Sequence, residues 1–280
     1  MLHPQIANVS ATRHILKKFN LRASKRLGQN FLIDADVVRR IVDAAEISAG
    51  EEILEIGPGI GTLTQGLLEA GAKVTAVEID KKLPEVLSET LAGYENFRLI
   101  QGDILKVDLS ELMPKNFKVV ANLPYYITTQ ILLTLLEKKL PITKIVTMVQ
   151  REVAERMTAA AGSKIYGAMS VAVQFRSESK ILFDVEPKSF LPRPEVTSSV
   201  VVCDVREFPQ KVSDEEFFIK IVRSSFGQRR KTILNSLTGA GFPREKVLKS
   251  LQSADINFER RAETLSIEEF IKLSEVFLQQ

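Results

Sequence analysis

The sequence predicts an α/β fold in which helices cover both faces of a doubly wound, mostly parallel sheet, with a small all-helical domain after it. Apolar strand runs alternate with segments of helical spacing from about residue 34 onward. The strand runs contain few polar positions, as expected of parallel strands buried on both faces. Beyond Pro209 only helical spacing remains. The 280 residues suffice for one large α/β domain and a small second one.

The first helix of the α/β part is predicted by apolar residues that repeat at helical spacing behind two possible caps, Asp34 and Asp36. A short apolar strand run at 52–56 then leads into a glycine loop. Further strands are expected at 74–77, 97–100, 119–121 and 145–149, and further helices at 63–68, 83–91, 127–136 and 150–161. Strands joined by helices in this way pair in parallel.

A different pattern begins near Ser170, where alternating apolar residues predict antiparallel strands that close the sheet. These strands are expected at 171–175, 181–185 and 198–205, and helices follow at 217–222, 233–237, 247–251 and 270–277. We therefore expect an N-terminal arm at 1–33, a sheet domain at 34–208 and a helical domain at 209–280. The boundary should lie between Phe208 and Ser213.

The composition is that of an ordinary soluble globular protein, with 45% hydrophobic and 26% charged residues. The longest apolar runs, such as 131–136, are too short to cross a membrane, and the N-terminus lacks the apolar core of a signal peptide. We expect a cytoplasmic protein. Its single cysteine, Cys203, excludes an internal disulfide, and with only His3 and His14 beside it we expect no metal site. Without a heptad repeat, a monomer is the expected state.

Positive charge is concentrated in two flanks of the chain. Residues 1–33 contain six basic side chains and no acid, and residues 217–244 contain six more, again with no acid. Residues 34–216 contain 21 basic and 28 acidic side chains. Such flanks favour a nucleic-acid footprint around a site in the body of the protein, because positive charge releases counterions from polyphosphate. A solvated helix face with a basic N-terminal arm explains the charge equally well.

The glycine loop, 55–61, lies where the first strand turns into a helix, which is the position of the ligand crevice in a doubly wound sheet. Gly57, Gly59 and Gly61 would let the backbone approach a nucleoside. A nicotinamide or flavin fingerprint requires a glycine at the next position, which is Thr62. The spacing therefore disfavours a dinucleotide.

Two acidic residues complete an adenosine pocket. Glu78 ends the second strand, where a carboxylate can accept hydrogen bonds from both ribose hydroxyls. Asp103 ends the third strand, where it can accept the exocyclic amine of adenine while Ile104 packs on the ring. The chain has no Gly-Lys-Ser/Thr phosphate loop, so S-adenosylmethionine fits this pocket better than ATP or NAD.

The segment Asn122-Leu123-Pro124-Tyr125-Tyr126 follows the fourth strand and is expected at the same sheet edge. An adenine amine is a weak nucleophile because its lone pair is delocalised into the ring. The Asn122 side-chain oxygen and the Leu123 carbonyl are acceptors that favour its more tetrahedral form, and Tyr125 can stack on the extruded base. Methyl transfer from a sulfonium needs positioning rather than a strong base.

These residues resemble the ribosomal RNA adenine dimethyltransferases, in particular the type that dimethylates two adjacent adenines of 16S rRNA. The resemblance covers nearly the whole chain and includes 27–32, 55–64, 102–104, 122–126, 190–198 and 226–232. It implies a Rossmann-like class I S-adenosylmethionine-dependent methyltransferase sheet and a helical RNA-binding domain. Its partner would be 16S rRNA in the small ribosomal subunit or its precursor, and its role would lie in ribosome biogenesis.

The resemblance also implies roles for individual residues. The cofactor would be bound by Asn30, Leu32, Gly57, Glu78, Asp103 and Asn122, with Asn30 and Leu32 at its methionine part. The catalytic group would be Asn122, Leu123, Tyr125 and Phe190, the two aromatic rings enclosing the target base. The segment Arg229–Lys231 would contact RNA.

Three alternatives remain open at this point. The sister group that dimethylates 23S rRNA and confers macrolide resistance shares the fold and cofactor, although Pro58 and Tyr126 look more like the small-subunit type. A DNA adenine methyltransferase usually has proline where this chain has Leu123. A ribosome-assembly factor without catalysis would have no need of the Gly57, Glu78 and Asn122 set.

Overall fold

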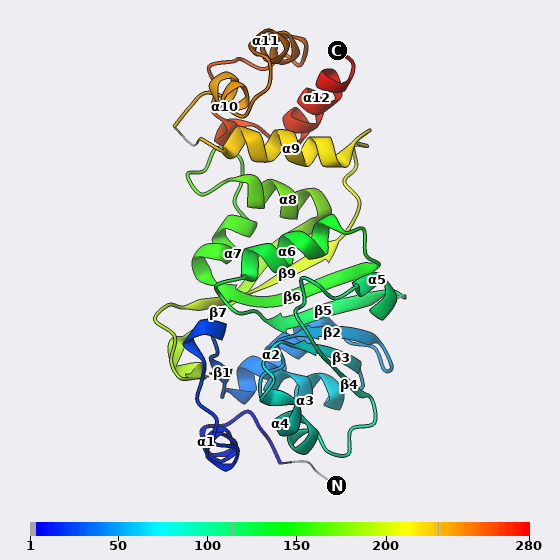
Figure 1. The fold of residues 1–280 in the computed structure, drawn as a ribbon, viewed down its shortest axis with the longest axis vertical. Helices are drawn as coiled ribbons and strands as arrows, with labels where there is room; N and C mark the ends of the chain where they lie inside the picture. Colours follow the sequence, from blue (N-terminus) through cyan, green and yellow to red (C-terminus); the bar gives the residue numbers. More distant parts are fainter. Residues whose placement is uncertain (1–3, 114, 229) are drawn as a thin grey trace. The chain divides into compact units, whose positions relative to one another are not determined.

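The computed structural model describes residues 4–113, 115–228 and 230–280, which form two compact units (Figure 1). The first unit runs to Ala154 and resumes over Ser179–Val205. The second comprises Glu155–Glu178 and Arg206–Gln280. The second unit therefore includes residues Glu155–Glu178, which the sequence predicts to lie in the sheet domain.

The first unit is built around a mostly parallel sheet, as the sequence predicts. The strand order is β4-β3-β2-β5-β6-β9-β7, in which the first five strands run parallel and β9 pairs antiparallel with β6. The strands are β2 (Glu52–Ile56), β3 (Lys73–Glu78), β4 (Phe97–Gln101), β5 (Phe117–Asn122), β6 (Ile142–Gln150), β7 (Ser177–Val185) and β9 (Ser198–Val205).

The strand β2 lies at the centre of the sheet, between β3 and β5. From β2 the chain first proceeds outward through β3 and β4, then returns to the other side of β2 to form β5. This reversal is the topological switch point, outside which open α/β sheets bind their ligands. The ends of β2 and β5 flank it, so the residues after Ile56 and after Ala121 are brought side by side.

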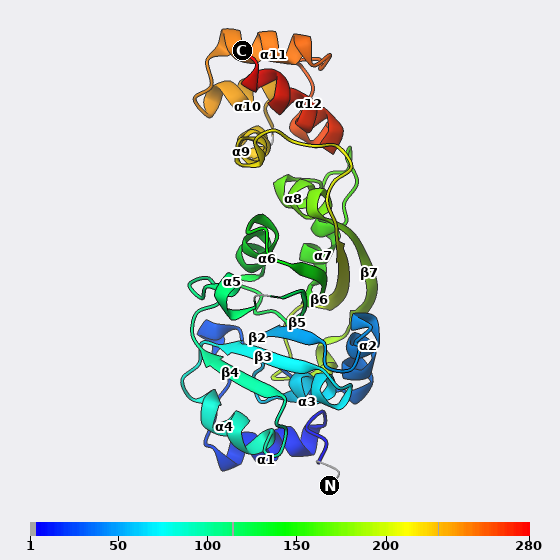
Figure 2. The same ribbon diagram turned by 90° about the vertical axis from the view of Figure 1, so that its right-hand side faces the viewer.

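Helices cover both faces of this sheet, and Figure 2 shows α2 (Ala35–Ala45) and α6 (Thr128–Glu137) on opposite sides. Asp34 caps α2 by accepting from the Asp36 and Val37 amides, and Val38 and Ile41 are buried against the sheet. Further helices of the unit are α3 (Thr62–Glu69), α4 (Leu83–Thr90) and α5 (Leu109–Leu112).

The N-terminal arm is more ordered than the sequence indicates. It contains the helix α1 (Val9–Lys18), a 3₁₀ turn at Lys25–Leu27 and the short strand β1 (Phe31–Leu32), which pairs antiparallel with β8 (Phe190–Leu191). The Asn8 side chain caps α1. The helix was missed because basic side chains dominate its sequence and leave a narrow apolar stripe.

The strand predicted at 171–175 is wrong, because this segment lies in the helix α8 (Ala168–Arg176). Val171, Val173 and Phe175 are all buried, so the helix is apolar on several sides and its spacing imitates strand alternation. The preceding helix, α7 (Arg151–Met157), ends earlier than predicted. The Gln174 side chain donates to the carbonyl of Met157, the last residue of α7, and to the carbonyl of Ala159 after it.

The C-terminal part of the second unit is helical, as predicted. Its helices are α9 (Glu215–Phe226), α10 (Ile233–Gly239), α11 (Arg244–Ser253) and α12 (Ile267–Leu278), and a further 3₁₀ turn lies at Ala262–Thr264. Phe218, Phe270 and Phe277 are fully buried in its core. No helix among the described residues has the length and apolar character that crossing a membrane requires.

Candidate functional site

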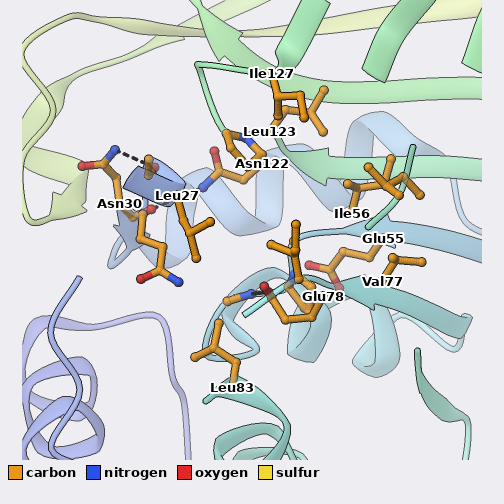
Figure 3. A pocket seen from close by; sticks show the side chains of 18 of the residues that line it. Leu27, Asn30, Glu55, Ile56, Val77, Glu78, Leu83, Asn122, Leu123 and Ile127 are labelled. Atoms are coloured by element: carbon orange, nitrogen blue, oxygen red, sulfur yellow. Dashed lines mark hydrogen bonds between the residues drawn. The ribbon is translucent and has the colours of Figure 1, made fainter. Parts of the chain in front are cut away.

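A cleft opens at the carboxyl ends of β2, β3, β4 and β5 in the first unit. Its walls are the N-terminal segment 27–32, the glycine loop and the loop after β5 (Figure 3). Of the predicted site residues, all but Phe190 line it: Asn30, Leu32, Gly57, Glu78, Asp103, Asn122, Leu123 and Tyr125. Residues separated by up to 95 positions in the sequence therefore share one cavity.

The glycine loop enters the cleft with its backbone bare. Gly57 has a φ of +69°, which a residue with a side chain rarely adopts, and a Cβ added there would meet open space. The Gly57 amide donates to the Val77 carbonyl at 3.0 Å, which fixes the loop to β3. The loop thus leaves room for a ligand against its main chain.

Glu78 lies at the floor of the cleft and is only 4% exposed. Its carboxylate accepts the Asp80 amide at 2.8 Å and the Gly59 amide at 3.4 Å. Burial raises the pKa of Glu78 above its ordinary value, although the two amide donors oppose that shift. Hydroxyl donors from a bound ribose would stabilise the charged carboxylate.

Glu55 is the last residue but one of β2 and is also buried beside the cleft. One of its carboxylate oxygens has no hydrogen-bond partner. Complete burial raises the pKa of Glu55 to about 8, and the negative charge of Glu78 acts in the same direction. The Thr64 hydroxyl opposes this shift, and the buried position still favours the neutral acid.

Asp103 lies just beyond β4, where the sequence places it. Its Oδ1 accepts the Leu105 amide at 3.1 Å, and its Oδ2 is 4.0 Å from Lys106 Nζ. The side chain remains 27% exposed. The carboxylate therefore has acceptor capacity left for an amine in the cleft.

Asn122 ends β5 at the top of the cleft in Figure 3. Its side-chain nitrogen donates to the Asn30 carbonyl at 3.5 Å, so its oxygen is the atom left to accept. The Leu123 amide is held by the Met148 carbonyl at 3.1 Å. The Pro124 carbonyl is occupied by the Ile127 amide and the Thr128 hydroxyl.

The two tyrosines after β5, Tyr125 and Tyr126, differ in their surroundings. Tyr125 lines the cleft with its hydroxyl 2.6 Å from the Ser198 hydroxyl, an anchor that holds its ring in place. Burial raises the pKa of Tyr125, so the hydroxyl stays protonated at neutral pH. Tyr126 is 57% exposed at the mouth of the cleft.

The structure places Phe190 in the apolar core, and its expected contact with the target base stays a prediction. The side chain is 1% exposed and belongs to the apolar core of the first unit, and it is absent from the cleft lining. The reason is strand pairing: Phe190 sits opposite Leu32 in the β1–β8 ribbon, so its partner strand stands at the cleft wall. In this structure Phe190 therefore packs in the core beside the strand that carries Leu32.

Gln29 lines the cleft and pairs with Asp80 just outside its lining, and neither residue was predicted. The Gln29 side chain donates to Asp80 Oδ2 at 2.8 Å, across 51 positions of sequence. Neither residue type is distinctive, and nothing in the local sequence signals the pairing. Among the described residues, no group of three or more histidine, cysteine or acidic side chains is arranged to hold a metal ion.

The fold and a cleft at the switch point of its sheet are those of a Rossmann-like class I methyltransferase. Comparisons with known proteins agree. The family model for ribosomal RNA adenine dimethylase matches residues 20–279. The chain therefore belongs to the ribosomal RNA adenine dimethylase family.

Curated relatives span the whole chain. Ribosomal RNA small subunit methyltransferase A of Clostridioides difficile (strain 630) is 46% identical over 279 residues, covering 97% of this chain and 96% of the relative. The protein of the same name from Bacillus pumilus (strain SAFR-032) is 46% identical over 287 residues, covering 98% of each.

Solved structures show the same fold at lower identity. A dimethyladenosine transferase from Plasmodium falciparum has a TM-score of 0.73 and 28% identity, covering 87% of this chain and 95% of that one. The 23S rRNA methyltransferase ErmE has a TM-score of 0.68 and 29% identity, covering 90% of this chain and 100% of that one.

Proposed function

We propose that this protein transfers methyl groups from S-adenosylmethionine to the exocyclic amines of two adjacent adenines in 16S rRNA, during biogenesis of the small ribosomal subunit. The observation that carries the proposal is the position of the Asn122 side chain and the Leu123 backbone beside a nucleoside pocket in one cleft. The curated relatives, named as small-subunit methyltransferases, support 16S rRNA as the substrate. We further propose that it acts as a cytoplasmic monomer.

The residues of the cleft fit this cofactor. Gly57 offers bare backbone, Glu78 offers a carboxylate to ribose hydroxyls, and Asp103 keeps acceptor capacity for the adenine amine. Asn30 and Leu32 close the cleft at the part assigned to the methionine end. When bound, S-adenosylmethionine supplies an activated methyl group on a sulfonium with a good leaving group.

The residues of the chain orient the target amine by accepting its hydrogens. Acceptance of the two amine hydrogens by Asn122 Oδ1 and the Leu123 carbonyl directs the nitrogen lone pair toward the methyl donor. Because the amine becomes strongly acidic once alkylated, its proton can leave to water after transfer. The absence of a histidine or lysine from the cleft lining among the described residues is compatible with this sequence of events.

Removal of the ribose carboxylate should weaken cofactor binding. We expect Glu78→Ala to lose about 1 to 3 kcal/mol of binding free energy, which is the cost of deleting one partner of a buried or charge-assisted hydrogen bond. Isothermal titration with S-adenosylmethionine measures it. The control is Glu52→Gln, which removes a partly exposed carboxylate at the start of β2, the end of that strand away from the cleft. Wild-type affinity in Glu78→Ala would place the ribose elsewhere.

Stacking of the target base is tested at Tyr125, the member of the predicted aromatic pair that lines the cleft. We expect Tyr125→Ala to lower kcat/KM for RNA by roughly 10- to 100-fold, because base stacking on an aromatic ring contributes about 1 to 3 kcal/mol. Tyr125→Phe keeps the ring and loses only the Ser198 contact, so it should stay within about fivefold of wild type. Equal losses in the two variants would show that the hydroxyl, not the ring, matters.

Basic side chains of the second unit are proposed as RNA contacts. Arg229 lies outside the described residues, while Arg230 and Lys231 follow α9 with exposed side chains. We expect Arg230→Ala/Lys231→Ala to reduce the slope of log K against log salt by roughly two, if both contact phosphate. Filter binding at several salt concentrations checks this, with Arg39→Ala, an arginine paired to Asp36 and Asp43, as control. An unchanged slope would assign both residues to a solvated face.

The second candidate function is 23S rRNA dimethylation, which the likeness to ErmE favours. The deciding experiment is transfer of labelled methyl groups from S-adenosylmethionine to purified small subunits that lack adenine dimethylation, with large subunits and DNA as parallel acceptors. We expect dimethyladenosine in 16S rRNA alone. Label in 23S rRNA would support the second candidate, and tight subunit binding without any label would indicate an assembly factor.

A further inference from the structure

The N-terminal segment 24–32 crosses the cofactor cleft and is attached to both of its sides. On one side Gln29 Nε2 donates to Asp80 Oδ2 at 2.8 Å, just beyond the end of β3. On the other side the Asn30 carbonyl accepts from Asn122 Nδ2 at 3.5 Å. The segment therefore bridges the strand end that carries Glu78 and the strand end that carries the amine acceptors.

Gln29 is prepared for this contact by the segment itself. Its Oε1 accepts the Ser24 amide at 2.8 Å, and its own amide donates to the Ser24 carbonyl at 3.2 Å. These bonds close a small loop before the cleft-lining residues. With Oε1 occupied, the side-chain nitrogen is oriented outward, toward Asp80.

Asp80 is fixed just as firmly on the opposite wall. Its Oδ1 accepts the Lys82 amide at 3.0 Å, and its own amide donates to Glu78 Oε1 at 2.8 Å. One oxygen, Oδ2, is left for Gln29. A continuous chain of hydrogen bonds thus runs from Ser24 through Gln29 and Asp80 to the carboxylate assigned to the ribose.

We propose that Gln29 and Asp80 form a clasp that holds the N-terminal segment closed over the bound cofactor and sets how slowly the cofactor dissociates. Both are positioning residues, because Gln29 orients Asn30 and Leu32 while the Asp80 backbone orients Glu78. The inference rests on the proposed function, since it takes S-adenosylmethionine as the occupant. A hydrogen bond to an ionised partner is stronger than a neutral one, so its loss should be measurable in the dissociation rate.

The donor and acceptor in this pair can be exchanged, which provides a sharp test. Gln29→Glu sets two carboxylates against each other, and we expect about tenfold faster cofactor dissociation and a raised KM for S-adenosylmethionine, with kcat changed less. In the double variant Gln29→Glu/Asp80→Asn, the amide introduced at position 80 donates to the carboxylate introduced at position 29. The pair is then restored with reversed polarity, and dissociation should return to within about threefold of wild type. Dissociation of labelled S-adenosylmethionine, chased with unlabelled cofactor, is the readout.

Gln65 provides a matched control. It also ties the N-terminal region through two backbone contacts, with Oε1 accepting the Ile6 amide at 2.9 Å and Nε2 donating to the Pro4 carbonyl at 3.1 Å. It is buried and does not line the cleft. Gln65→Ala should therefore lower thermal stability without speeding cofactor dissociation, whereas Gln29→Glu should speed dissociation.

Amide hydrogen exchange provides a second readout that does not depend on turnover. Cofactor binding should slow exchange of residues 24–32 in the wild type and in the exchanged pair, and much less in Gln29→Glu. Should Gln29→Glu fail to fold, Asp80→Asn is the second variant: its single oxygen must serve both the Lys82 amide and Gln29, and it carries no charge. At least about threefold faster dissociation is expected.

The outcomes separate the two proposals. If the wild type binds cofactor and Gln29→Glu dissociates at the wild-type rate, or if the exchanged pair is no slower than Gln29→Glu, the clasp is wrong and the proposed function stands. If the wild type binds no S-adenosylmethionine at all, the proposed function is wrong and the clasp with it.

Discussion

Replacement of Asn122 by alanine is expected to lower kcat for methyl transfer by at least about 100-fold, because one oriented group that stabilises the reacting atoms contributes roughly that factor or more. The Asn122 nitrogen is engaged with the Asn30 carbonyl, which leaves its oxygen to accept the target amine. Cofactor affinity should stay largely intact, because Gly57, Glu78 and Asp103 remain in place. Single-turnover transfer and titration calorimetry on the same preparation measure the two effects.

Asn96→Ala is the control for this variant. Asn96 donates through Nδ2 to the Ala72 carbonyl at 2.5 Å, in the same unit but away from the cleft lining. It should lose stability and retain turnover. Unchanged turnover in Asn122→Ala would refute the acceptor role, and an equal loss in both variants would attribute the effect to folding.

The second large effect concerns stability. Between pH 4.5 and 8 the ligand-free protein should lose about 4 kcal/mol of its free energy of unfolding through Glu55, given its ordinary pKa of 4.5 and its raised pKa of about 8. The sign follows from proton binding. In this range the unfolded chain releases the proton while the folded protein retains it, so rising pH favours unfolding. The contribution is complete below pH 4.5 and is lost by about pH 8.

Glu55→Gln tests this because the amide mimics the neutral acid and cannot ionise. Urea unfolding is followed by circular dichroism at pH steps from 4 to about 8.5. The free energy of unfolding of the variant should rise relative to that of the wild type as the pH rises. Glu52→Gln, on the same strand with a side chain 36% exposed, should run parallel to the wild type. Parallel curves for Glu55→Gln would mean that the Glu55 proton is lost at an ordinary pH.

Local chemistry made much of this site predictable. Gly57, Glu78, Asp103 and Asn122 each lie at or just after the end of a strand, and the carboxyl ends of parallel strands meet at one edge. Their gathering in a cleft required only that the sheet be parallel. The helix α8 could not be distinguished in the same way, because a helix buried on several sides and a short strand share one apolar pattern.

The sequence by itself determined the alternation of the parallel strands with helices, the bare backbone at Gly57 and the polar residues at the strand ends, because these depend on periodicity and on residue type. Only the tertiary structure decided that Phe190 is buried behind Leu32 and that Gln29 meets Asp80. Both outcomes depend on pairing between segments far apart in the chain. Such pairing follows from packing of the whole unit, and no local pattern of residues encodes it.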